Sequence, residues 1–224
     1  MEKDNAGRLI AGIILFGSLW GMLEATLGSI LHYTLILNAG AIMTAAGFFI
    51  MAIAVSIYKK PQIAPYIGIV AASEKFLGFL IFPLSSWGQI VRPATSIFLE
   101  SLVFGIVLMF LWSGYRKKIG IKILCAAISS YFGFFLYVFV GRLVFKGGVG
   151  IMDIPGLIKH VVSNATIIFI ISSFLVPAGN WLGDRIKTSM EQTMFRNPKF
   201  YYGITGLVSA FCWVVAMIAT VKGL

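Results

Sequence analysis

Three glutamates lie inside long apolar runs of the sequence, and they are the residues there most able to do chemistry. Glu24, Glu74 and Glu100 stand among residues that would otherwise suit a lipid environment. A charge near the centre of a bilayer costs at least about 2.5–3.5 kcal/mol, so such carboxylates are expected to face one another, a counter-ion or a water-filled cavity. These side chains therefore predict a site for a cationic ligand.

The three carboxylates are also predicted to reach one level of the membrane. At a rise of roughly 1.5 Å per residue, Glu24 and Glu74 lie about 21 and 18 Å above the inner face of a hydrocarbon core about 30 Å thick. By the same rise, Glu100 lies about 9 Å below the outer face, which is nearly the same height. We expect the three acids to line one polar cavity that is open to the outside.

Other polar residues are expected near this cavity. Lys159, His160 and Asn164 enter a later apolar run from its outer end and complete the predicted substrate-binding set. Three acids facing one or two bases favour a ligand with a positive centre, either an amine-bearing solute or a metal ion. The residues expected at the rim or gate of the cavity are His32, Trp87, Arg92 and Arg142.

The same charges have a second interpretation, which the sequence leaves open. Glu100 with Lys159, and Glu74 with Lys75, are possible ion pairs that only hold helices together. Under this interpretation the protein is an accessory or assembly subunit of a larger membrane complex. A third alternative is a secondary carrier that uses a glutamate as its own proton relay.

The composition indicates which elements position these side chains. The chain has 224 residues, of which 59% are hydrophobic and 12% charged, and its mean hydropathy is +0.94. Apolar runs of about 20 residues, the length that crosses a bilayer as a helix, recur along it. We therefore predict an all-α, multi-pass membrane protein, a single domain over residues 1–224. The seven predicted spans are 9–31, 38–57, 62–82, 94–112, 120–141, 155–176 and 200–221.

The positive charges predict the orientation of these spans. The net charge is +10, and the basic residues cluster between apolar runs, as at Lys59–Lys60 and Arg116–Lys118. This is the pattern of cytoplasmic loops, so it does not indicate nucleic-acid binding. We expect a cell (inner) membrane protein with its N-terminus in the cytoplasm and its C-terminus outside. Segment 177–199 is predicted to be an amphipathic cytoplasmic connector that leads to an extra last helix at 200–221.

Two patterns concern how the helices pack. Glu24 to Gly28 is similar to Glu74 to Gly78, which suggests that the fold is built from repeated helical hairpins. Gly17, Gly21 and Ala25 form a ridge of small residues at every fourth position. Such a ridge allows close helix packing, either inside the bundle or against a partner subunit.

A small, basic and very hydrophobic bundle with this ridge resembles the S components, the substrate-binding membrane subunits, of energy-coupling factor (ECF) transporters. The resemblance covers roughly residues 8–176, and the last predicted helix lies beyond it. It implies that the chain captures a scarce solute on the outside, such as a vitamin precursor or a metal ion. It further implies import with a transmembrane partner and an ATPase module on other chains. We expect no enzymatic activity and no cofactor.

Overall fold

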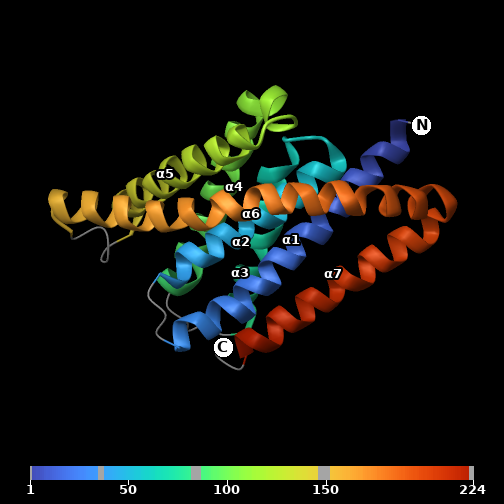
Figure 1. The fold of residues 1–224 in the computed structure, drawn as a ribbon. Helices are drawn as coiled ribbons and strands as arrows, with labels where there is room; N and C mark the ends of the chain where they lie inside the picture. Colours follow the sequence, from blue (N-terminus) through green and yellow to red (C-terminus); the bar gives the residue numbers. More distant parts are fainter. Residues whose placement is uncertain (1, 35–37, 82–86, 146–151, 222–224) are drawn as a thin grey trace.

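The computed structural model describes residues 2–34, 38–81, 87–145 and 152–221, and every regular element in this part of the chain is an α-helix (Figure 1). Consecutive helices pack against each other as hairpins in the pairs α1–α2, α3–α4 and α5–α6. The seven helices are α1 (Glu2–Tyr33), α2 (Ala39–Tyr58), α3 (Ile63–Ile81), α4 (Trp87–Tyr115), α5 (Ile119–Val144), α6 (Ile154–Arg196) and α7 (Pro198–Val221).

The predicted class of the protein is confirmed. Among the described residues, six helices rather than the seven predicted are long and apolar enough to cross a membrane: α1, α2, α4, α5, α6 and α7. Helix α3, which corresponds to the predicted span 62–82, is not among them. The described helices extend beyond the predicted spans at several ends. For example, α4 begins at Trp87 and includes Pro93, a residue expected in a loop. The chain is a multi-pass membrane protein.

The central helix of the bundle is α2. Its sequence contains no charged residue and is rich in alanine, and most of its side chains are buried. It packs against α1, α3, α4 and α6, while α7 lies outside the bundle along α1 (Figure 1). Because small side chains let helices approach closely, α2 can be surrounded on several sides at once. The helices that carry the predicted site residues, α1, α3, α4 and α6, therefore surround α2.

Helix α6 differs from its prediction. The sequence pattern predicts a span that ends at residue 176 and a separate connector over 177–199, whereas α6 continues through Pro177 as one helix of 43 residues. A proline inside a helix removes one backbone hydrogen bond. The helix continues nonetheless, and Figure 1 shows it crossing the whole bundle.

Packing against α2 explains why α6 continues. Gly179 and Gly183 lie directly on the backbone of α2, where a Cβ atom would meet the carbonyl oxygens of Phe49 and Ile53. Beyond them, Leu182 packs against the main hydrophobic core, as does Met190. Part of the apolar face of the predicted amphipathic connector is thus covered by the chain itself.

The small-residue ridge of α1 is likewise covered within the chain. Gly17 lies against Val70 of α3, and Gly21 lies against Glu74 of the same helix. Ala25 belongs to a buried cluster with Ala216 and Ala219 of α7. Of the two uses that the sequence left open for the ridge, internal packing is the one observed. A partner that docks on the ridge would have to displace α3 and α7.

One end of the bundle carries most of the basic residues, and we call it the basic end. It contains the starts of α1, α3, α5 and α7 and the ends of α2, α4 and α6 (Figure 1). Its charged residues include Arg8, Lys59, Lys60, Lys118, Lys122, Asp184, Lys187 and Glu191. The sequence predicts that this end faces the cytoplasm.

Candidate functional site

Glu100 is the most enclosed of the three predicted acids. It lies on α4 with 3% of its surface exposed, and Ser96, one turn earlier on the same face, donates a hydrogen bond of 2.7 Å to its Oε1. The Thr44 hydroxyl of the central helix faces the same carboxylate. On the α5 side, Gly133 packs against Glu100, and a Cβ there would make an ordinary contact of 3.8 Å with the Glu100 Cγ. Two neutral hydroxyl groups thus face this acid.

Glu24 lies between a base and a second acid. The Lys75 Nζ is 3.8 Å from Glu24 Oε1 and donates a hydrogen bond of 3.3 Å to the Glu24 backbone oxygen. Both side chains are partly buried. The charge of Glu24 also acts on Glu100, so the two acids are close enough to influence each other electrostatically. The ammonium of Lys75 therefore neutralises one member of this acid pair.

Glu74 is buried in a different direction. Only 4% of its surface is exposed, and its carboxylate lies over Gly21 of α1. The Ser18 hydroxyl faces it, while Ser18 Oγ accepts a hydrogen bond of 2.8 Å from Trp213 Nε1 of α7. Within the described residues, neither carboxylate oxygen makes a hydrogen bond of normal geometry. Glu74 thus faces α1 and α7, whereas Glu100 faces α2 and α5.

The two ion pairs that the sequence suggested are not the ones formed. Among the described ion pairs, Lys75 is joined to Glu24 rather than to Glu74, and none includes Glu100 or Lys159. Successive residues of a helix point about 100° apart, so Lys75 and its neighbour Glu74 reach different parts of α1. Lys159 is exposed on α6. Its separation from Glu100 follows from the place of α6 beside α5 and α2.

The remaining predicted residues of α6 interact with each other. The Asn164 side-chain amide donates a hydrogen bond of 2.9 Å to the His160 backbone oxygen and lies 3.3 Å from the His160 Nδ1. The His160 ring contacts Phe134 of α5, with 5.6 Å between ring centroids. These contacts place both residues at the α5–α6 interface. No described contact of either reaches a glutamate.

The predicted rim residues divide into two groups. The Arg92 guanidinium lies 5.4 Å from the centre of the Phe145 ring, and Arg142 is exposed and donates a hydrogen bond of 3.4 Å to the Met152 oxygen. The side chains of His32 and Trp87 lie outside the described part of the structure. A polar residue that the sequence analysis missed is Tyr137 of α5, which is close to both Glu100 and Arg92.

The polar atoms that this region offers a ligand are carboxylate and hydroxyl oxygens. Within the described residues, no group of three or more histidine, cysteine, aspartate or glutamate side chains is arranged to hold a metal. The hydroxyl groups of Ser96 and Thr44 lie beside Glu100, and the charge of Glu24 acts on the same carboxylate. Carboxylates and hydroxyls together can accept and orient the N–H donors of an ammonium group.

The basic end has a polar network of its own, which sequence reasoning did not foresee. Ser56 donates a hydrogen bond of 2.7 Å to Asp184 Oδ1, and Lys59 pairs with the same carboxylate. Nearby, Arg8 Nη2 lies 3.0 Å from Glu191 Oε1. These pairs connect α1 and α2 to the last part of α6. The network depends on the continuation of α6 beyond residue 176.

The chain matches no known protein-family model, and no curated protein or solved structure is significantly similar to it.

Proposed function

We propose that this protein is a transport subunit that binds the positively charged group of a small solute between Glu24 and Glu100. The observation that carries the proposal is the environment of Glu100, which is buried, faces neutral hydroxyl donors and has a second acid nearby. A buried carboxylate without a cation is costly in a membrane. A cationic ligand, or a proton in its absence, would relieve that cost.

The resemblance to S components suggests the direction of transport and its source of energy. The chain would receive a solute at the end of the bundle opposite the basic end and release it toward the other side, with the energy supplied by an ATPase on partner chains. A carrier driven by protons is the alternative form. Uptake that stops on ATP depletion but continues after collapse of the proton gradient supports the first form, and the reverse result supports the second.

The substitution Glu100→Gln tests the binding site. We expect it to weaken binding of a cationic solute by about 30-fold or more, because removal of one partner of a buried charge pair costs at least about 2 kcal/mol. The purified protein is screened by thermal shift against protonated amines and divalent metal ions, with carboxylates and neutral sugars as negative probes. A ligand that binds the folded state raises the unfolding midpoint.

Two matched variants accompany this test. Glu24→Gln should reduce the shift produced by the cation, and Glu191→Gln, an acid of the basic end, should leave it unchanged. The proposal is wrong if no cationic probe shifts the wild-type midpoint. It is also wrong if Glu191→Gln removes the shift as completely as Glu100→Gln does.

A structural role is the second candidate function, and the ion pair between Lys75 and Glu24 favours it. In an assembly subunit, this pair would hold α1 to α3 and no solute would bind. The pair is partly buried, so removal of one partner leaves a poorly solvated charge and costs more than it would in an exposed pair, for which about 0–1 kcal/mol is typical. Substitutions of Lys75 and Glu24 therefore distinguish the solute-binding role from the structural role.

The substitution Lys75→Met provides the distinction. We expect the free energy of unfolding to fall by about 1–2 kcal/mol, because Glu24 is left without its base, and to recover in Lys75→Met/Glu24→Gln. If the protein binds cations, Lys75→Met also strengthens the thermal shift caused by the cationic probe, because the competing ammonium is gone. A loss of stability with no ligand response in any variant would favour the structural role.

A further inference from the structure

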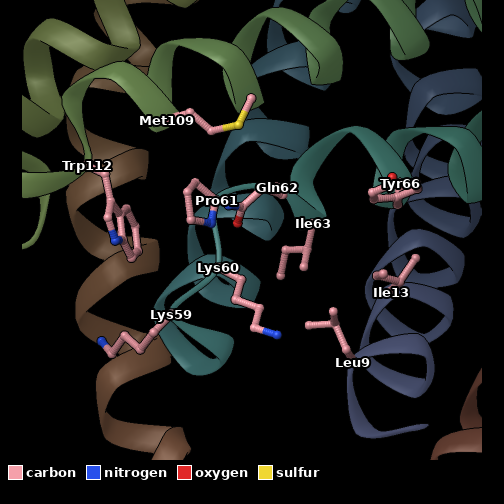
Figure 2. A pocket seen from close by; sticks show the side chains of 10 residues that line it. All are labelled: Leu9, Ile13, Lys59, Lys60, Pro61, Gln62, Ile63, Tyr66, Met109 and Trp112. Atoms are coloured by element: carbon pink, nitrogen blue, oxygen red, sulfur yellow. The ribbon is translucent and has the colours of Figure 1, made fainter. Parts of the chain in front are cut away.

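A pocket of about 590 Å³ opens at the basic end, away from the buried acids. The turn between α2 and α3 forms its centre, and α1 and α4 form its sides (Figure 2). It is lined by basic and amide side chains together with a larger number of apolar ones, a combination that suggests a ligand. The lining residues are Leu9, Ile13, Lys59, Lys60, Pro61, Gln62, Ile63, Tyr66, Met109 and Trp112.

The polar part of the pocket carries an uncompensated positive charge. Lys59 points toward α6, where it pairs with Asp184, whereas Lys60 extends across the pocket toward Leu9 of α1 (Figure 2). Lys60 is exposed and takes part in none of the ion pairs among the described residues. Its ammonium group is therefore available to an anion, and the Gln62 amide on the same turn offers further hydrogen-bond donors.

A neighbouring pocket of about 210 Å³ extends the positive region, and it shares Leu9, Lys59 and Lys60 with the first. The charged side chains of the two pockets and their partners are four bases and two acids, which leaves a net charge of +2. These residues are Arg8, Lys59, Lys60 and Lys187, with Asp184 and Glu191. A local field of this sign attracts anions and weakens as salt is added.

The apolar part of the pocket faces the lipid side of the bundle. Tyr66 and Met109 line the pocket and are exposed, Tyr66 by 56%. Next to Met109, Phe110 is 84% exposed, and Ile10 of α1 is exposed beside the other wall. A large apolar surface of this kind at the end of a membrane helix lies in contact with acyl chains. A soluble anion would not need such a wall.

From this combination we propose that the pocket binds an anionic glycerophospholipid. The phosphate group lies against Lys60 and the Gln62 amide, and the first part of an acyl chain lies along Ile13, Tyr66 and Met109. Basic pockets between membrane helices on the cytoplasmic side are suited to acidic headgroups. Trp112, whose residue type favours the membrane interface, also lines the pocket, on its α4 side (Figure 2).

Native mass spectrometry of the full-length protein tests the assignment. The protein in mild detergent receives equal amounts of a phosphatidylglycerol and a phosphatidylcholine with identical acyl chains. We expect the wild type to retain the anionic lipid at least about tenfold better than the zwitterionic one. Lys60→Glu should reduce retention of the anionic lipid by on the order of tenfold, and Lys60→Gln by less, since one basic residue near an acidic lipid contributes about fivefold.

The matched control is Lys117→Glu, which makes the same charge change at an exposed position of the turn between α4 and α5, outside the pocket. It should leave lipid retention within about twofold of wild type. Equal losses for Lys60→Glu and Lys117→Glu would overturn the proposal, because only net charge would then matter. Equal retention of the two lipids by the wild type would overturn it as well.

A competition experiment separates a lipid from a free phosphate. Millimolar inorganic phosphate should leave the bound phosphatidylglycerol in place, because the acyl chain contributes its own burial of apolar surface. If inorganic phosphate displaces the lipid completely and itself raises the unfolding midpoint of the wild type but not of Lys60→Glu, the pocket is a site for a soluble anion and the lipid assignment is wrong.

Discussion

Gly183→Val is expected to lower the free energy of unfolding by about 3 kcal/mol or more, because α6 packs in close contact with the backbone of α2 at this position. A Cβ atom on Gly183 would lie 2.8 Å from the Ser56 Cβ and 3.1 Å from the Ile53 Cα, so a valine forces two helix backbones apart. In a chain of this size, 3 kcal/mol corresponds to a decrease of roughly 6–12 °C in the unfolding midpoint. Thermal unfolding in detergent measures it.

The chain offers a close control for this variant. Gly206 lies in the middle of α7, and a Cβ there would have nothing within 4 Å. Gly206→Val therefore makes the same chemical change in a helix without a clash, and it should shift the midpoint by no more than about 2 °C. Equal midpoints for the two variants would contradict the observed packing of α6 on α2, and with it the basic-end network that depends on this packing.

Trp20→Ala should be the other strongly destabilising change, with an expected loss of about 3–5 kcal/mol. The indole of Trp20 is 1% exposed and fills the space over Gly47 of the central helix, where a Cβ would collide with the ring. Its removal leaves a cavity in the middle of the bundle. The unfolding midpoint measured by thermal denaturation should fall by roughly 6–20 °C.

Two further comparisons make this prediction specific. One is the control variant Trp181→Ala, and the other is Gly47→Ala introduced alone and together with Trp20→Ala. Trp181 is exposed and stacks on Arg185, so its removal should cost about 1 kcal/mol or less. Gly47→Ala should destabilise the wild type but cost less in the Trp20→Ala background, where the cavity accepts the new methyl group. If Trp20→Ala keeps its midpoint and loses the response to the cationic probe, Trp20 belongs to the ligand site and not to the core.

Helix content and membrane class could be predicted from the sequence because both depend on the run of residues along the chain. Apolar stretches near 20 residues, such as Ala39–Tyr58, form a hydrogen-bonded helix whatever surrounds them in a bilayer. The ends of the helices were predicted less well. Glycines at 179 and 183, which weaken an isolated helix, stabilise the packed one by letting α6 approach α2.

The acids themselves were also evident from the sequence, since Glu24, Glu74 and Glu100 are conspicuous in apolar surroundings. Their partners were not. Lys75 follows Glu74 in the chain but pairs with Glu24 across the α1–α3 interface. Ser18 of α1 faces Glu74, and Trp213 donates a hydrogen bond to this hydroxyl because α7 lies along α1.

The sequence by itself thus determined that this chain spans a membrane as α-helices, that its positive charge gathers at one end, and that three carboxylates lie within its apolar runs. These properties follow from side-chain solvation and helix periodicity, which act locally. Only the tertiary structure decided which acid meets a base, which meets a hydroxyl, and which small residues are covered by α3 and α7. Such choices depend on the rotation and neighbours of each helix, and contacts distant in sequence establish them.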